Sequence, residues 1–228
     1  MRGWEVDQNA AELAATNLHL RGVSLAEKPI RLGDGLNYSR DEVRYDVVIS
    51  NLAPRGMGPA KRTTDYWANT PSRHFNYLHR CSTLLRDEGR AAVIVPDRVL
   101  FIGGQYGGEI ARRQLLELFD VHTLLRLPLG IFPGLGVKAS VLFFDKKPIH
   151  GRPGTKKLWV YDMGQNLGFQ IRDRRVSFED FRDFVMCYSA LDKAARIESE
   201  SFGSFTYKEL VERESVNLDL SSYHPPQS

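Results

Sequence analysis

The sequence predicts an α/β domain built around a largely parallel sheet. Short apolar runs alternate with stretches of helical length, and turns containing Gly, Pro or Asp separate them. The run 45–50, Tyr-Asp-Val-Val-Ile-Ser, is rich in β-branched residues, as expected of a strand buried on both faces. With 228 residues, the chain is long enough for one large domain, or for one domain plus a tail.

The individual elements follow from local periodicity and from their turn residues. Residues 9–21 carry a mostly apolar stripe at helical spacing, and Gly22 stands where a C-terminal cap is expected. The strand at 29–32 stops at Gly33, and the strand at 45–50 leads into a loop rich in Gly and Pro. In chain order the predicted elements of this part are strand 4–6, helix 9–21, strands 29–32 and 45–50, helix 75–85, strand 90–95 and helix 109–119.

Two further strands, 121–127 and 139–144, are separated by the loop 128–138. They are close enough in sequence to form an antiparallel hairpin, which we expect at the edge of the sheet. One more strand is expected at 158–161. Beyond it the pattern is more polar and less regular, with helices predicted at 178–186 and 207–213.

Charge is distributed unevenly along the chain, although the net charge is only +3. Residues 51–80 hold five basic residues against one acidic residue, and residues 138–175 hold nine against three. Residues 176–228 hold five basic and ten acidic residues. The two basic stretches are suited to contact phosphates, and the alternative interpretation is a set of solvated surface loops.

Several classes of protein are excluded by composition. No apolar run reaches the roughly 20 residues that a membrane-spanning helix needs, and residues 1–7 carry no signal-peptide pattern. Cys81 and Cys187 belong to no Cys-x-x-Cys pair, and the six His residues show no zinc-like spacing. We therefore expect a cytoplasmic protein with no metal site and no membrane contact.

Polar residues follow three of the predicted strands at the point where each one ends. Glu5 ends the first strand, Asp34 follows the second and Asn51 follows the third. In open α/β sheets, ligands bind outside the carboxyl ends of the strands, where a carboxylate can accept both hydroxyls of a ribose. An Asn amide offers both a donor and an acceptor. Each residue alone could equally shape a turn, but three in succession at one edge indicate a ligand site.

These residues and their surroundings resemble the methylation subunits of type I restriction–modification systems. Asn51 and the strand before it resemble the strand that delivers the Asn-Pro-Pro-Phe motif of that family. The resemblance runs in the same order along nearly the whole chain. Its segments are Gly3–Asp7, Ala11–Leu20, Gly33–Leu36, Tyr45–Asn51, Leu84–Asp97, Leu127–Phe132, Gly136–Asp145, Leu158–Asp162, Phe205–Tyr207 and Val216–Leu220.

The resemblance implies a Rossmann-like class I methyltransferase sheet and transfer of a methyl group from S-adenosyl-L-methionine to the N6 amine of adenine in DNA. It implies that Glu5 and Asp34 bind the cofactor and that Asn51 is catalytic, orienting the amine of an adenine flipped out of the duplex. DNA and the specificity and restriction subunits are the implied partners. The expected domains are a partial catalytic domain, 1–147, and a C-terminal extension of the methylation subunit, 148–228.

The chain departs from the family pattern after Asn51. Leu52, Ala53 and Pro54 stand in place of Pro-Pro-Phe, so a rigid Pro and the aromatic ring that stacks on the flipped base are replaced. Base–aromatic stacking contributes about 1–3 kcal/mol per base, so base flipping is expected to be less favourable. Tyr66 and Trp67 are the aromatic residues that could substitute from the following loop.

A second departure concerns the start of the chain. In the family, a central strand and a Gly-rich loop that holds the methionine part of the cofactor precede the position of Glu5, and we expect this first strand to be missing. The loop Gly103–Gly108 follows a later strand, and is interpreted either as the lead into a helix beside the catalytic face or as a plain turn.

Three hypotheses follow from the sequence. The first is a degenerate or truncated type I adenine methyltransferase with weak activity or none. The second is a non-catalytic module that binds DNA or a specificity subunit through its basic stretches. The third is an incomplete gene product whose missing strand is encoded upstream.

Overall fold

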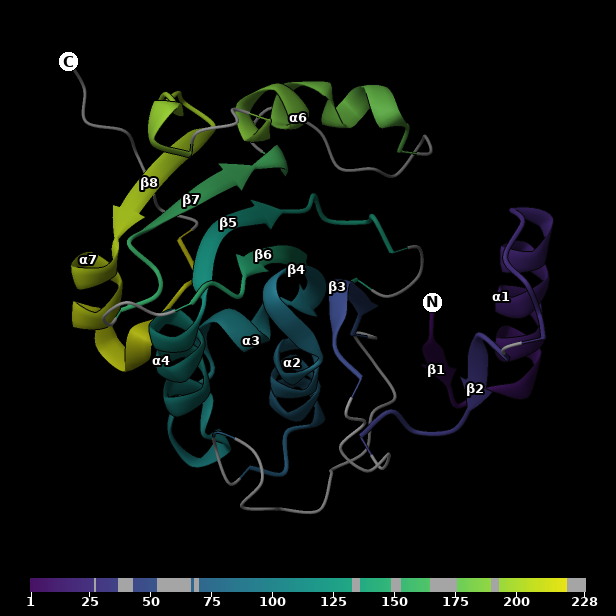
Figure 1. Ribbon diagram of the computed structural model, residues 1–228. Coiled ribbons are helices and arrows are strands. Elements are labelled where there is room, and N and C mark those ends of the chain that lie inside the picture. Colours follow the sequence, from purple (N-terminus) through teal and green to yellow (C-terminus); the bar gives the residue numbers. More distant parts are fainter. Residues whose placement is uncertain are drawn as a thin grey trace. The chain divides into compact units, whose positions relative to one another are not determined.

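The computed structural model describes residues 1–26, 28–36, 43–52, 67, 70–132, 136–148, 153–164, 176–189 and 193–220. The chain divides into two compact units, Met1–Val43 and Arg44–Ser228, each of which is described by itself. Figure 1 labels the helices and strands of both units.

The first unit contains a β–α–β arrangement. Strand β1 (Gly3–Glu5) leads into helix α1 (Gln8–Leu20), and strand β2 (Ile30–Leu32) pairs with β1 in parallel. The Asp7 side chain caps α1 by accepting a hydrogen bond from the Ala10 backbone N–H at 2.8 Å. The strand–helix–strand order predicted for this part of the sequence is confirmed.

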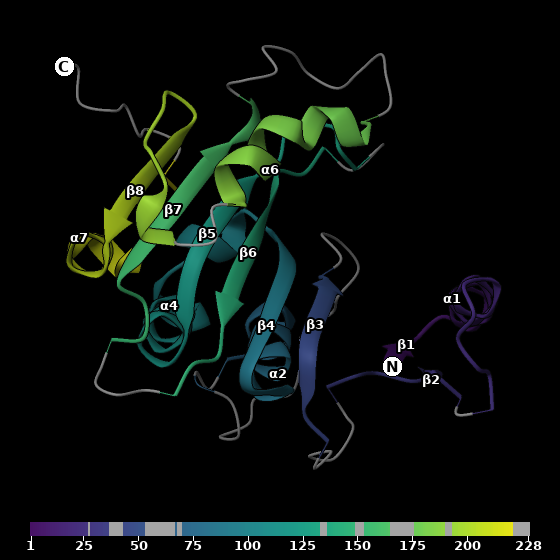
Figure 2. The same ribbon diagram turned by 45° about the horizontal axis from the view of Figure 1, so that its top comes forward.

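The second unit is built on a six-stranded sheet in the order β3-β4-β6-β5-β7-β8. Figures 1 and 2 show helices α2, α3 and α4 on one face of this sheet and α6 on the other. The strands are β3 (Tyr45–Asn51), β4 (Leu85–Pro96), β5 (Asp120–Arg126), β6 (Ala139–Asp145), β7 (Lys157–Asp162) and β8 (Phe202–Thr206). The helices are α2 (Arg73–Thr83), α3 (Arg98–Phe101), α4 (Gly108–Leu118), α6 (Arg182–Tyr188) and α7 (Tyr207–Glu212). The short 3-10 helices are η1 (Gly104–Tyr106), η2 (Phe178–Phe181), η3 (Lys193–Ala195) and η4 (Glu214–Val216).

Strand direction corrects two expectations about the sheet. Strands β5 and β6 do pair antiparallel, but they are interior strands, because β6 also pairs with β4 and β5 also pairs with β7. The hairpin therefore does not lie at the sheet edge. In the six-stranded sheet two pairings are parallel and three are antiparallel, so this open sheet is mixed rather than mostly parallel.

The C-terminal strands belong to the same sheet as the central ones. Strand β7 pairs in parallel with β5, and β8 continues the sheet beyond β7. Strand β8 was not predicted, because Gly203 and Ser204 interrupt its apolar pattern. The domain boundary expected after residue 147 stays a prediction.

Apolar side chains pack on both faces of the sheet, but the expectation that the strand at 45–50 is buried on both faces is wrong, since Ile49 of β3 is 81% exposed. On the α6 face, Phe184 packs with Trp159, Tyr161 and Phe202 in one buried cluster. On the other face, α2 and α4 bury residues such as Leu78 and Leu115, neither of which is exposed at all. No helix in the described parts of the chain has the length and apolar character needed to span a bilayer.

Candidate functional site

Asn51 is the last residue of β3 and lies at the carboxyl end of that strand. It pairs with Ile94 of β4, which in turn pairs with Val141 of β6. Paired residues of neighbouring strands project to the same face, so Asn51 shares the α6 face with these two apolar residues. Its side chain is exposed. An exposed amide beside apolar neighbours is available to hydrogen-bond a planar amine.

Leu52, the first departure from the family motif, points to the opposite face. Its side chain is only 2% exposed, and its backbone N–H donates to the Ile94 carbonyl at 3.0 Å, which extends the β3–β4 ladder by one bond. A Pro at this position has no N–H and could not make that bond. Replacement of the motif Pro by Leu is therefore matched by the local structure. Ala53 and Pro54 lie outside the described residues.

A polar cluster occupies the same edge of the sheet, at the ends of β4, β5 and β7 and at the start of β6. The buried guanidinium of Arg126 contacts three carboxylates: Asp219 at 2.7 Å, Asp162 at 3.3 Å and Asp97 at 3.6 Å. The Ser140 hydroxyl donates to Asp97 Oδ1 at 2.7 Å. Burial raises the pKa of Asp97, while the Ser140 hydrogen bond and Arg126 oppose that shift. The cluster joins the C-terminal segment 217–220 to the carboxyl edge.

Glu5 and Asp34 lie in the first unit, at the ends of neighbouring parallel strands. Glu5 pairs with Leu32, and its carbonyl accepts from the Gly33 backbone N–H at 2.7 Å, so Asp34 follows directly at the same edge. Glu5 Oε1 accepts from the backbone N–H groups of Val6 and Asp7, at 2.7 and 2.9 Å. This leaves Oε2 without a partner among the described residues. The two predicted cofactor-binding carboxylates thus share one edge, whereas Asn51 belongs to the other unit.

The ring of Trp67 packs on α2 and is therefore not placed to stack on a flipped base. Its ring stacks on His79 of α2, with 4.4 Å between centroids and 6° between planes, and its backbone N–H donates to His79 Nδ1 at 3.1 Å. Its ring centroid is also 6.0 Å from that of Phe119, at the end of α4 away from the carboxyl edge. Tyr66, the other expected substitute, lies outside the described residues.

The glycines between 103 and 108 serve either a left-handed backbone conformation or close packing. Gly107 has a left-handed φ of 65° and caps α4, while a Cβ on Gly108 would lie 1.9 Å from the Ile102 carbonyl oxygen. Thr70 donates to the carbonyl of Tyr106 at 2.6 Å. These contacts order the loop as a turn that leads into α4. They favour its interpretation as a turn with a structural role.

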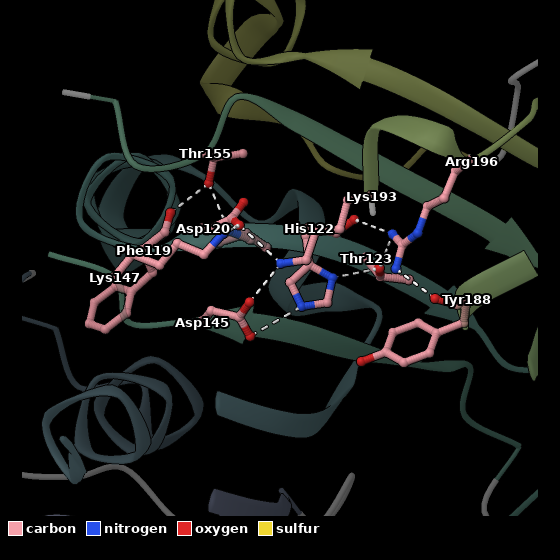
Figure 3. Close-up of polar contacts among 11 residues, drawn as sticks. Phe119, Asp120, His122, Thr123, Asp145, Lys147, Thr155, Tyr188, Lys193 and Arg196 are labelled. Carbon is pink, nitrogen blue, oxygen red and sulfur yellow. Dashed lines mark hydrogen bonds and ion pairs between the residues drawn. The ribbon is translucent and has the colours of Figure 1, made fainter. Parts of the chain in front are cut away.

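A second polar cluster, which the sequence did not reveal, lies at the opposite end of the sheet (Figure 3). His122 and Asp145 sit at the start of β5 and the end of β6, with His122 Nε2 3.4 Å from Asp145 Oδ1. Lys193 contacts Asp145 at 2.6 Å and Asp120 at 3.0 Å. Although burial alone would raise the pKa of Asp145, hydrogen bonds from His122 and Lys193 lower it below its usual range. The cluster fastens the C-terminal part of the chain to the sheet.

Within the described parts of the chain, no group of three or more His, Cys, Asp or Glu residues is arranged to hold a metal ion. Cys81 and Cys187 are free thiols. The described polar side chains at the carboxyl edges are carboxylates, an amide and a few cations, which supply hydrogen bonds and charge.

The open α/β sheet of this chain, with polar groups at its carboxyl edge, is also the fold of a solved protein described as a methyltransferase. A Listeria monocytogenes protein, described as a candidate class I S-adenosylmethionine-dependent methyltransferase, shares this fold at a TM-score of 0.55 and 20% identity. The match covers 72% of this chain and 49% of that one.

Within that class the family is defined by the sequence itself. The profile of the family N-6 DNA Methylase matches residues 1–228, and the chain belongs to that family. It is 36% identical over 143 residues to the type I restriction enzyme EcoKI methylase subunit of Escherichia coli strain K12, across 60% of this chain and 27% of the relative. The crystal structure of the EcoKI M protein matches with a TM-score of 0.81 and 25% identity, across 96% of this chain and 53% of that one. The chain thus spans about half the length of that solved relative, and the matched segment spans about a quarter of the Escherichia coli subunit.

Proposed function

We propose that this chain contributes the adenine-orienting part of an N6-adenine DNA methyltransferase of a type I restriction–modification system. The observation that carries the proposal is the position of Asn51, exposed at the carboxyl end of β3 in a chain of the N-6 DNA Methylase family. Its amide oxygen would accept a hydrogen from the N6 amine of a flipped adenine. This orients the nitrogen lone pair for attack, and such catalysis works mainly by positioning.

The proposed cofactor is S-adenosyl-L-methionine, which supplies an electrophilic methyl group when it is bound. The carboxylates of β1 and β2 fit the adenosine part of this molecule. Glu5 Oε2 is available to accept a ribose hydroxyl, and Asp34 follows β2 at the same edge, where it can accept from an exocyclic amine. DNA and the specificity and restriction subunits of a type I system are the proposed partners.

Activity is proposed to be weak for a reason that lies in the motif. Leu52 is buried on the α2 face, so it offers nothing to the base beyond its backbone carbonyl. Pro54 has no aromatic face, and Trp67 stacks on His79 instead. Without a stacking ring, the extruded adenine loses roughly 1–3 kcal/mol of stabilisation.

The test is methylation of an adenine-containing duplex with radiolabelled cofactor. Wild-type activity that Asn51→Ala abolishes and Asn9→Ala leaves intact would support the proposal, because Asn9 is an exposed residue of α1. Calorimetric titration with the cofactor checks the other edge: Glu5→Ala should weaken binding, and Glu12→Ala should not. DNA binding that is salt-dependent but indifferent to the cofactor, without methylation, would favour the alternative of a non-catalytic DNA- or specificity-subunit-binding module.

A further inference from the structure

Two exposed cations lie beside the buried carboxylate of Asp97. Arg98 follows Asp97 directly as the first residue of α3, and the Lys138 carbonyl accepts from the Asp97 backbone N–H at 3.0 Å. Both side chains are exposed, and neither makes a hydrogen bond or an ion pair with another residue in the described parts of the chain. The two basic side chains thus flank one turn at the carboxyl end of β4.

This turn lies on the edge of the sheet that Asn51 occupies. Strand β4 is the direct neighbour of β3, and Asn51 pairs with Ile94, only three residues before Asp97. Figure 2 shows β4 between β3 and β6. Neighbouring strands are about 4.8 Å apart, so β6, which begins after Lys138, lies roughly 10 Å from β3. A nucleotide that reaches Asn51 brings its own backbone phosphates to this edge.

At this edge the acidic side chain of Asp97 points into the protein, whereas the basic side chains point to solvent. The carboxylate of Asp97 is turned inward, with its side chain 13% exposed, toward Arg126 and the Ser140 hydroxyl. Arg98 and Lys138 face solvent instead. Arg126 offsets one of the three carboxylate charges beneath the surface, and the charge of Lys138 also acts to lower the pKa of Asp97, which burial raises. The two side chains of the turn that face solvent, Arg98 and Lys138, are both positive.

We propose that Arg98 and Lys138 bind phosphates of the DNA strand that carries the target adenine, and that Asp97 is the residue that positions them. This inference rests on the proposed function, because it takes DNA as the substrate. Asp97 acts through two bonds: its backbone N–H holds the Lys138 carbonyl, and its Oδ1 accepts from Ser140 two residues further along. Together they fix the start of β6 against the end of β4.

The test of the phosphate contacts is the salt dependence of duplex binding, measured by fluorescence anisotropy on the full chain. Each lost phosphate contact should reduce the magnitude of the slope of log K against log salt by about 0.9. At 0.1 M salt the affinity for DNA should fall roughly five- to tenfold. We expect this change for Arg98→Gln and for Lys138→Gln. The control is Lys208→Gln, since Lys208 is an exposed residue of α7, and α7 begins beside Lys156 at the other end of the sheet.

The positioning role of Asp97 can be tested with a variant for which the loss of charge and the loss of geometry change the DNA affinity in opposite directions. Asp97→Asn and Asp97→Ala both remove one negative charge, which by itself would strengthen DNA binding. Only the Asn variant keeps an acceptor for the Ser140 hydroxyl. We expect Asp97→Asn to bind DNA at least as tightly as wild type and Asp97→Ala to bind at least threefold more weakly, with the folded fraction of each confirmed by circular dichroism.

The outcomes separate the inference from the function on which it rests. A wild-type chain with no salt-dependent binding to duplex DNA would contradict DNA as the substrate, and with it the proposed function. Binding whose salt slope is the same in wild type, Arg98→Gln and Lys138→Gln would overturn only the phosphate contacts. Equal affinity of Asp97→Asn and Asp97→Ala would overturn the positioning role of Asp97.

Discussion

His122 Nε2 lies 3.4 Å from Asp145 Oδ1, and because the ionised carboxylate can only accept a hydrogen bond, the neutral ring carries its proton on Nε2 (Figure 3). Arg196 Nη1 donates to the Thr123 hydroxyl oxygen at 2.9 Å, so the hydroxyl hydrogen is free to point to His122 Nδ1, 2.8 Å away. Nδ1 is then an acceptor, and Nε2 carries the hydrogen that faces Asp145. Burial lowers the pKa of His122, which favours this neutral form of the imidazole.

This arrangement predicts that the protonation of His122 destabilises the second unit in mild acid, at pH values where Asp120 and Asp145 stay ionised. The folded pKa of His122 lies below the unfolded value of about 6.5, so the unfolded state binds the extra proton more readily. The free energy of unfolding should therefore decrease as pH falls from 7.5 to 5. Asp120, Lys193 and Asp145 also face the ring, but Asp120 and Asp145 have lowered pKa values and so stay ionised in this range.

Urea unfolding at pH 7.5, 6 and 5 measures this dependence. His122→Gln keeps a donor toward Asp145 and an acceptor toward Thr123 without a titrating ring, so its stability should change less over the same range. His19→Gln serves as the control, since His19 is exposed on α1 in the first unit. An identical pH dependence in wild type and His122→Gln would contradict the prediction.

Gly108 is predicted to be the least replaceable glycine of its loop. A Cβ there would lie 1.9 Å from the Ile102 carbonyl oxygen and 2.9 Å from both Arg112 Nη1 and Phe75 Cζ. Gly108→Ala should lower the free energy of unfolding by roughly 3 kcal/mol, since backbone and buried side chains must both move. Gly104→Ala is the matched control: its φ is 54°, but nothing lies within 4 Å, so the cost should be about 1 kcal/mol of backbone strain. Equal costs in denaturant unfolding would show that packing around Gly108 is not the constraint.

The two thiols should differ in reactivity. Burial raises the pKa of Cys81 to about 11, although a hydrogen bond with Ser50 opposes the shift, and the side chain is 5% exposed. Burial also raises the pKa of Cys187, but this thiol is only half-buried on α6. Because the thiolate is the reactive form, a disulfide reagent at pH 8 should label Cys187 first and Cys81 only on unfolding. Mass spectrometry of partially labelled protein identifies the modified residue, and early labelling of Cys81 would contradict its burial.

The sequence was sufficient for features that depend on local pattern. Helix α1 and strand β3 were predicted within one residue of their observed bounds, because periodicity and turn residues mark them. Interior positions of β5 and β6 could not be predicted, since strand order is set by long-range packing. The His122 and Arg126 clusters were missed for the same reason: their partners, such as Lys193 and Asp219, are distant in sequence.

Leu52 is predicted to make restoration of the family motif costly. Leu52→Pro would remove the N–H that donates to the Ile94 carbonyl and would empty a site where the Leu side chain is 2% exposed. Leu52→Pro should lower the free energy of unfolding by roughly 3–5 kcal/mol. Leu52→Ala keeps the N–H and should lower it by about 2–4 kcal/mol through the cavity alone. Thermal unfolding of the two variants separates the contribution of the hydrogen bond from that of the packing.

Because Leu52→Pro breaks the β3–β4 hydrogen bond, the triple variant Leu52→Pro, Ala53→Pro, Pro54→Phe should methylate DNA no faster than wild type, although it regains an aromatic ring for the base. Faster methylation by the triple variant would show that the β3–β4 ladder tolerates the Pro and that the missing ring was the principal defect.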